Sequence, residues 1–306
     1  MNRLATDLCG IRLESPLVLA SGIMGMSASS MKRISEAGAG AVTTKSCGIG
    51  ERKGHPCPCV IPFEHGLLNA VGLANPGIEE MNREISEFKI RVGKPLIASI
   101  FGKTEDGFGE AAARISLSKP DLIEVNVSCP NVASEFGLPF AADADACGRI
   151  THMVKERANG IPVSMKLSLQ CPSIAAVGRA CQENGADAIT AINSVGPGML
   201  IDLNVRKPIL ANQVGGVSGA AIMPLAVRAV WDLFRAVTIP IIGTGGVTRP
   251  EDALQLILAG ATAVGIGSGV YAYGLDIFSA TNAFLAQWLE RDECSSLADI
   301  RGSAHG

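Results

Sequence analysis

Short hydrophobic segments, many of them rich in β-branched residues, recur along the chain. They lie at residues 15–22, 40–46, 94–102, 121–129, 161–168, 186–193, 239–246 and 261–269. Stretches with the periodicity of amphipathic helices separate most of these segments, for example 173–185, 221–237 and 249–260. Continuously hydrophobic strands that alternate with amphipathic helices are typical of a parallel sheet covered by helices.

The number and spacing of these units predict the fold class. Eight strand and helix units over ~250 residues favour a closed (β/α)8 barrel, the TIM barrel, over an open doubly wound sheet. Residues 1–14, MNRLATDLCGIRLE, read as a short N-terminal hairpin that would cap the bottom of the barrel. Because no linker rich in Pro, Gly or Ser divides the chain, we predict a single domain over residues 1–306.

Composition and charge narrow the class of ligand. The chain has 26 Lys and Arg against 29 Asp and Glu and lacks a dense basic run, which argues against nucleic acid or an anionic membrane as its partner. A small neutral or anionic ligand fits better. Nine cysteines without the spacing of a disulfide framework, and an N-terminus without a signal-type apolar core, predict a cytoplasmic protein with reduced thiols.

Polar residues gather where the predicted strands end. In a barrel of this kind the chemistry lies at the carboxyl ends of the strands. A single lysine after a strand is usually a solvated loop charge, but these residues would all face one mouth: Ser21, Lys45, Ser46, Ser99, Asn126, Lys166, Asn193 and Ser194. We therefore expect a binding site there.

Two glycine clusters follow the last two strands. They read GTGG at 243–246 and GIGSG at 265–269, and phosphate sites in such barrels are commonly built from these two loops. The alternative is that the glycines only make tight turns. The second cluster is not a dinucleotide fingerprint, since its sixth position is Val270 and the expected acidic residue is missing further on. Direct binding of a nicotinamide cofactor is therefore not predicted.

The fourth strand ends in the stretch EVNVSCPNV, where Pro130 stops the strand and leaves the Cys129 thiol at the mouth. Cys129 could act as a general base or as a nucleophile. By contrast, we interpret Cys9, Cys147, Cys181 and Cys294 as packing residues. The spacing of Cys47, Cys57 and Cys59 is poor for zinc, so no metal site is predicted.

Seven ordered motifs spread over the chain carry a family resemblance. They are TTKS, LLNAVGLANPG (67–77), EVNVSCPNV, MKLS, INS, GGVSG (215–219) and IIGTGGV. Together they closely resemble dihydroorotate dehydrogenase of class 1. The stretch DLNVRKPILANQVGGVSG (202–219) is most similar to class 1B, the catalytic subunit of the NAD-linked enzyme, rather than to the fumarate-using class 1A.

The resemblance implies an FMN enzyme that oxidises (S)-dihydroorotate to orotate in pyrimidine biosynthesis. Cys129 would be the base that removes the C5 proton while the C6 hydride passes to the flavin. The residues implied for the pyrimidine and its carboxylate are Lys45, Asn69, Ala70, Val71, Gly72, Leu73, Asn126, Asn131, Asn193 and Ser194. Asn131 would separate this chemistry from that of dihydropyrimidine dehydrogenase, which typically has histidine there.

A second group of residues is implied for the cofactor, with Lys166 stabilising negative charge on the reduced flavin. The group is Ser21, Lys45, Ser46, Ser99, Asn126, Lys166, Ile192, Gly219, Gly245, Gly246, Gly267 and Ser268. The chain departs from the family pattern at Ser99, where relatives often carry asparagine. It departs again at LSLQCPSI after the fifth strand, where Ser-Pro-Asn is usual.

Electrons are expected to leave through a partner, because the chain has neither a dinucleotide fingerprint nor a cysteine set suited to an iron–sulfur cluster. In class 1B the partner is a separate subunit with FAD and a [2Fe–2S] cluster that passes electrons to NAD+, in a heterotetramer built on a homodimer. The alternatives are a class 1A enzyme, a dihydropyrimidine dehydrogenase-like flavoenzyme, a phosphosugar lyase or isomerase with Lys166 as Schiff base, and a non-catalytic flavin-binding protein.

Overall fold

The computed structural model describes residues 2–127 and 140–306, and it contains a closed barrel of eight parallel strands. Each barrel strand pairs with the next barrel strand along the chain, and the last pairs with the first. The strands are β3 (Leu17–Leu19), β4 (Ala41–Thr43), β7 (Leu96–Ile100), β8 (Leu122–Asn126), β9 (Val163–Leu167), β10 (Ala188–Ala191), β15 (Ile241–Thr244) and β16 (Ala263–Ile266). All eight lie within the predicted segments, so the predicted (β/α)8 class is confirmed.

The barrel strands are hydrophobic throughout because they are buried on both faces. Every residue of β7, β8 and β9 is buried. In β8, Ile123 and Val125 pack into the large core beneath the helices. Side chains alternate along a strand, so Glu124 and Asn126 face the barrel interior. In β8 the alternation therefore directs the polar side chains into the barrel and Ile123 and Val125 toward the helices.

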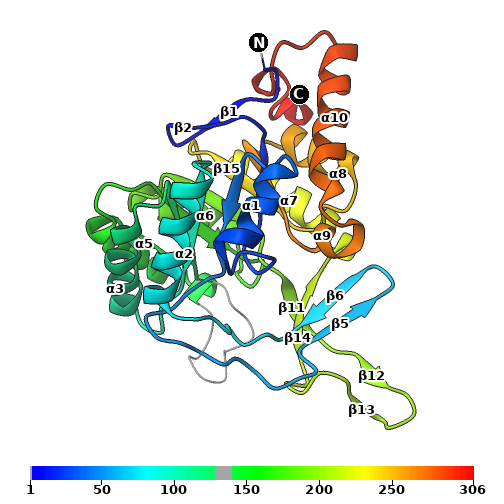
Figure 1. Cartoon of the computed structure of the whole chain (residues 1–306). Helices are drawn as coiled ribbons and strands as arrows, with labels where there is room; N and C mark the ends of the chain where they lie inside the picture. The colour runs from blue at the N-terminus through cyan, green and yellow to red at the C-terminus, as the bar shows by residue number, and fades with distance from the viewer. Residues whose placement is uncertain (1, 128–139) are drawn as a thin grey trace.

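An outer layer of helices surrounds the barrel (Figure 1). The α-helices are α1 (Ala28–Glu36), α2 (Ile78–Arg91), α3 (Glu105–Ile115), α5 (Ala144–Arg157), α6 (Ile174–Glu183), α7 (Met223–Phe234), α8 (Pro250–Leu258), α9 (Ser268–Tyr273) and α10 (Asp276–Arg291). Side-chain oxygens cap the first turn of α1, α3, α5 and α6 and accept from backbone N–H groups there. Short 3-10 turns are η1 (Ser116–Ser118), η3 (Phe140–Ala142), η4 (Ala220–Ile222), η5 (Leu297–Asp299) and η6 (Ser303–His305).

The predicted N-terminal hairpin is confirmed as β1 (Thr6–Leu8) paired with β2 (Ile11–Leu13). Leu8 and Leu13 are fully buried in one apolar cluster with residues from the amino ends of barrel strands, Val18, Ala41, Ile97, Leu122, Ile242 and Ala263. The hairpin therefore closes the bottom of the barrel, as expected from its sequence.

A second sheet stands at the end of the molecule opposite this hairpin (Figure 1). Its four antiparallel strands are β5 (Val60–Phe63), β6 (Gly66–Asn69), β14 (Gly215–Ser218) and β11 (Val195–Gly198), and a small hairpin of β12 (Ile201–Asp202) and β13 (Lys207–Pro208) extends from it. We call these strands the arm. The arm was not predicted from the sequence. The single domain over residues 1–306 stays a prediction that limited proteolysis would test.

Within residues 2–127 and 140–306, no helix combines the length and the apolar character that crossing a membrane requires.

Candidate active site

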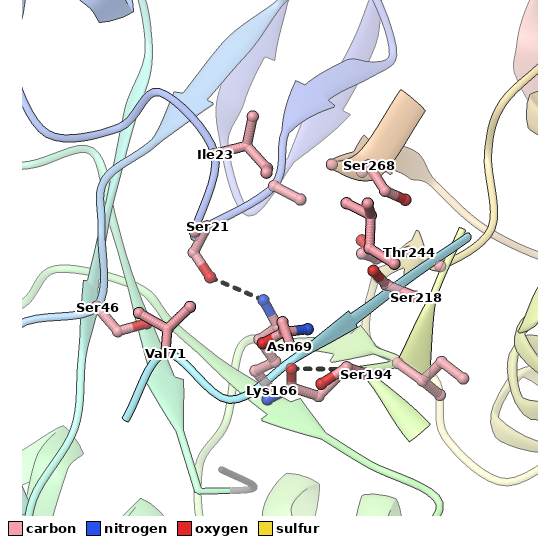
Figure 2. Close-up of a pocket in the computed structure, with 18 of the residues that line it drawn as sticks. Ser21, Ile23, Ser46, Asn69, Val71, Lys166, Ser194, Ser218, Thr244 and Ser268 are labelled. Atoms are coloured by element: carbon pink, nitrogen blue, oxygen red, sulfur yellow. Dashed lines mark hydrogen bonds between the residues drawn. The ribbon is translucent and has the colours of Figure 1, made fainter. Parts of the chain in front are cut away.

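A pocket opens at the carboxyl ends of the barrel strands, between the barrel mouth and the arm (Figure 2). The barrel contributes residues at the ends of seven strands, all but β7, and the arm contributes Val60, Leu67, Asn69 and Ser218 from β5, β6 and β14. One wall of the pocket is therefore formed by the barrel, and the other by arm strands that lie far apart in the sequence. Its position is the one where active sites of such barrels lie.

The charges of the described lining residues are all positive. Lys45 follows β4 and Lys166 lies in β9, and the described lining contains neither Asp nor Glu. Lys166 is only 4% exposed. Two ammonium groups in a partly enclosed, low-dielectric site attract an anionic group more strongly than they would in water. The pocket is therefore suited to an anion.

Lys166 contacts one oxygen at the barrel mouth and another inside the barrel. Its Nζ donates a hydrogen bond of 2.8 Å to Ser21 Oγ, which follows β3 on the facing side of the barrel (Figure 2). The same Nζ lies 3.5 Å from Oε1 of Glu124 in the neighbouring strand β8. The ammonium group thus lies between the pocket and an acid inside the barrel.

A chain of side-chain amides crosses the floor of the pocket. Asn193 Nδ2 donates to Asn126 Oδ1 at 3.1 Å, and Asn126 Nδ2 approaches Ser46 Oγ at 3.4 Å. Asn193 Oδ1 in turn accepts from the backbone N–H of Ser194 at 2.9 Å. These contacts fix the orientation of each amide, so the floor presents ordered donors and acceptors to a planar ring.

The third group of lining residues is a short loop after β6. Val71, Gly72 and Leu73 line the pocket. Arg52 Nε donates to Gly72 O at 2.6 Å, and the backbone N–H of His55 donates to Val71 O at 3.1 Å. A side chain at Gly72 would meet the His55 ring at 2.7 Å, so the position requires glycine. The loop is held from behind by residues of the preceding segment.

The glycine side of the pocket has the features of a cradle for a phosphate-bearing group. Gly245 and Gly246 have φ angles of +121° and +81°, and a Cβ at Gly246 would lie 2.5 Å from the backbone of Met223. Next to them, Thr244 Oγ1 is buried without a hydrogen-bond partner among the described residues. An orphaned hydroxyl is costly unless a ligand satisfies it. Bare backbone and an orphaned hydroxyl together fit the cofactor implied by the sequence.

Most of the residues implied by the family resemblance come together in this pocket. Those that line it are Ser21, Lys45, Ser46, Asn69, Val71, Gly72, Leu73, Asn126, Lys166, Ile192, Asn193, Ser194, Gly245, Gly246, Gly267 and Ser268. Cys129 and Asn131 lie outside the described residues, so the roles of the base and of the ring-gripping amide stay predictions.

Three of the implied residues do not line the pocket. Ala70 is fully buried after β6, and Gly219 packs so closely on Gly66 that a Cβ would lie 2.6 Å from its Cα. Ser99 is also fully buried, and its Oγ lies 2.8 Å from Ser46 Oγ. Ser99 is therefore connected to the pocket through Ser46, which lines it.

Sequence reasoning missed several lining residues. Val60 lies in β5 of the arm, which carries little local signal, whereas Leu67, Ser218 and Thr244 lay inside motifs already quoted. Buried Glu124 was missed too, although an acid within an apolar strand is a signal that could have found it.

Cys47, Cys57 and Cys59, the cysteines between β4 and β5, differ in exposure. Cys47 is fully buried and Cys57 is exposed. Burial raises the pKa of the Cys47 thiol to about 12, partly offset by the charge of Lys45. In the part of the chain that the structure describes, no three His, Cys, Asp or Glu side chains are grouped as a metal site would need.

Comparisons with known proteins agree with the family predicted from the motifs. A family model described as dihydroorotate dehydrogenase matches residues 3–289. A protein of Methanocaldococcus jannaschii named "Dihydroorotate dehydrogenase B (NAD(+)), catalytic subunit" is 42% identical over 305 residues, 99% of this chain and 98% of its own. Proteins with the same name from Methanothermobacter thermautotrophicus (40% over 302 residues, 99% and 98%) and Methanosarcina mazei (42% over 299 residues, 97% and 94%) are similarly close.

Proposed function

Because the chain belongs to the dihydroorotate dehydrogenase family, we propose that it oxidises (S)-dihydroorotate to orotate in the pocket at the barrel mouth. The observation that carries the proposal is the lining itself: Lys45 and Lys166, an ordered row of amides and a glycine wall, with no acid among the described lining residues. Dihydroorotate is a small anion with a ring of alternating donors and acceptors. The lining is complementary to both properties.

Enzymes of this family are flavoproteins, and we propose FMN as the flavin. When bound, FMN supplies the acceptor for the hydride that leaves C6 of the substrate. The described residues proposed to hold it are Ser21, Lys45, Ser46, Asn126, Lys166, Ile192, Gly245, Gly246, Gly267 and Ser268. The orphaned Thr244 hydroxyl and the glycine cradle support this assignment, because each is suited to a phosphate-bearing ligand.

The proposed work of the remaining residues is to bind and orient the substrate and to move one proton. Lys45 attracts the substrate carboxylate, and Asn69 and Asn193 bind the ring edge by hydrogen bonds. Val71, Gly72 and Leu73 exclude water from above. Cys129 is proposed as the base that takes the C5 proton, in which case the proton ends on its Sγ and the ring gains its double bond.

The electrons are proposed to leave through a separate subunit to NAD+. The relatives are named as the catalytic subunit of an NAD(+) enzyme, which implies that a second subunit completes it. The proposed partner carries FAD and a [2Fe–2S] cluster and binds a homodimer of this chain. Exposed apolar side chains on the arm, including Ile201, Leu203 and Val205, support a surface covered by protein. We also propose a cytoplasmic location, since the eight described cysteines are free thiols.

The test is the visible spectrum of the purified, flavin-reconstituted protein. We expect a flavin band that bleaches when dihydroorotate is added without oxygen and that stays unchanged with dihydrouracil, which lacks the carboxylate. A protein that binds no flavin, or whose flavin is bleached equally by dihydrouracil, would contradict the proposal. The second outcome would favour a dihydropyrimidine dehydrogenase-like activity.

A further inference from the structure

Glu124 is an acid buried inside the barrel directly below the pocket. It lies in the middle of β8, a strand in which every residue is buried, and its side chain is only 3% exposed. Its register partners on the neighbouring strands are Ser99 in β7 and Ser164 in β9. An ionised carboxylate at such a place is strongly unfavourable unless a charge and hydrogen bonds compensate it.

Both kinds of compensation come from groups connected to the pocket. Glu124 Oε1 accepts a hydrogen bond of 3.0 Å from Ser99 Oγ, and Lys166 Nζ lies 3.5 Å from the same oxygen. The Lys166 side chain is itself only 5% exposed, so the pair is buried at both ends. A buried charge without its counter-charge is strongly destabilising, so each side chain stabilises the burial of the other.

The contacts extend from Glu124 to two sides of the pocket. On one side Lys166 continues to Ser21 Oγ at 2.8 Å. On the other side Ser99 Oγ continues to Ser46 Oγ at 2.8 Å, and Ser46 Oγ lies 3.4 Å from Asn126 Nδ2. Hydrogen bonds in such a connected, dry network polarise one another. Glu124 is thus the buried centre of a network whose outer members line the pocket.

We propose that Glu124 is a positioning residue that directs the Lys166 ammonium toward Ser21 and offsets part of its positive charge, and so sets the reduction potential of the flavin bound above it. The inference rests on the proposed flavin function. Lys166 favours the reduced flavin because reduction adds negative charge next to an ammonium group. The carboxylate opposes this effect, since it lies beside the same ammonium in a medium that screens poorly.

The test compares the midpoint potential of bound FMN in the wild-type chain and in Glu124→Gln. Glutamine keeps the size of the side chain and can still accept from Ser99, but it removes the negative charge. We expect the potential to rise, because the Lys166 charge is no longer offset. A tenfold change in the equilibrium between oxidised and reduced flavin corresponds to about 30 mV for a two-electron couple, and we expect at least this shift in anaerobic dye-equilibrated titrations.

The matched control is Ser164→Ala, one strand away from Glu124 in the same register. Ser164 Oγ forms a buried hydrogen bond of 2.9 Å with Thr190 Oγ1, so its loss perturbs the barrel interior without changing a charge. We expect this variant to lose stability and to keep the wild-type potential. A potential that is unchanged or lower in Glu124→Gln, or one that rises equally in the control, would overturn the proposal.

A second variant covers the case in which Glu124→Gln does not fold. Ser99→Ala removes a hydrogen-bond donor from the carboxylate and leaves its charge in place, so the carboxylate offsets Lys166 more strongly. We expect the potential to fall in this variant, and an unchanged or raised potential contradicts the inference. Failure of the wild-type chain to bind flavin or to react with dihydroorotate would instead count against the proposed function, so the two failures are distinguishable.

Discussion

Thr244 is the residue whose hydroxyl most directly reports a missing ligand. Its Oγ1 is buried at the glycine side of the pocket without a partner among the described residues. We expect Thr244→Val, which has the same shape without the hydroxyl, to weaken FMN binding by about 2- to 10-fold, the equivalent of one net hydrogen bond. Fluorescence titration of the apoprotein with FMN measures the change.

Among the described residues, a second buried threonine hydroxyl without a hydrogen-bond partner lies outside the pocket lining and offers a matched control. Thr281 in α10 is fully buried, and its Oγ1 also has no partner in the described part of the chain. Thr281→Val should leave FMN affinity unchanged, and neither variant should lower the free energy of unfolding of the apoprotein. Equal FMN affinity of wild type and Thr244→Val would show that the hydroxyl does not contact the cofactor.

Cys129, which lies outside the described residues, is proposed as the base because of the family resemblance. We expect Cys129→Ala to slow flavin reduction by dihydroorotate by ~10²-fold or more, which is the usual contribution of a positioned base. Orotate should still bind, because the side chain moves a proton and does not hold the ring. Stopped-flow bleaching measures the rate, and Cys57→Ala, which removes an exposed thiol outside the pocket lining, is the control. Reduction at a near-normal rate would assign Cys129 a structural role.

Cys47 provides a prediction that depends on pH. Burial raises its pKa from 9.0 to about 12, so at pH 9 an ordinary thiol is half ionised while Cys47 stays protonated. Because the thiolate is the reactive form, we expect iodoacetamide to modify Cys47 at pH 9 about 10²- to 10³-fold more slowly than an ordinary thiol. Peptide mass spectrometry at successive times measures this. Equally fast labelling of Cys47 and of exposed Cys57 in the folded protein would contradict it.

At the scale of elements, the turn after β15 depends on the close approach of Gly246 to α7. A Cβ at Gly246 would lie 2.5 Å from the backbone N and Cα of Met223, and its φ is +81°. We expect Gly246→Ala to destabilise the protein by more than the ~1–2 kcal/mol that a left-handed residue costs, and to weaken FMN binding by about tenfold or more. Urea denaturation and FMN titration measure the two effects.

A variant at Gly160 serves as the control that distinguishes backbone strain from steric contact. Its φ of +78° is nearly the same, but nothing lies within 4 Å of the position of its Cβ. Gly160→Ala should therefore cost only the backbone strain and leave FMN affinity unchanged. If Gly246→Ala and Gly160→Ala lowered the free energy of unfolding equally, the close approach of the turn to α7 would add nothing to the cost of the substitution.

The barrel could be predicted from the sequence, and the arm could not. Parallel strands covered on both faces need continuous hydrophobic runs such as 94–102 and 121–129, and this local signal is strong. The arm instead pairs β6 with β14, which come from different halves of the chain. Its strands therefore depend on a partner that no local sequence pattern reveals. A four-residue strand such as Val195–Gly198, with two glycines and a proline, carries almost no propensity of its own.

The same distinction applies to the candidate site. Residues at the ends of barrel strands, such as Lys45 and Asn193, could be predicted because the fold class alone brings them to one mouth. The position of Ser99 could not, because its contact with Ser46 and Glu124 depends on side-chain packing inside the barrel. Glu124 shows the limit most clearly, since its partner Lys166 lies on another strand and the pairing appears only once both strands are placed.

At the scale of the whole molecule, the route of the electrons determines which assembly is active. The pocket accounts for one cofactor site, while the glycines at 265–269 fail the dinucleotide pattern at Val270. A chain reduced by dihydroorotate therefore has no predicted site at which NAD+ can take up the hydride.

We expect the isolated chain to be reduced rapidly by dihydroorotate and to transfer electrons to NAD+ only after a co-purified iron–sulfur flavoprotein subunit is added. Absorbance at 340 nm follows NADH, with the oxidised partner alone as control. Rapid NAD+ reduction by the isolated chain would contradict the separate subunit, and rapid fumarate reduction by it would assign the chain to class 1A, because fumarate needs no second nucleotide site.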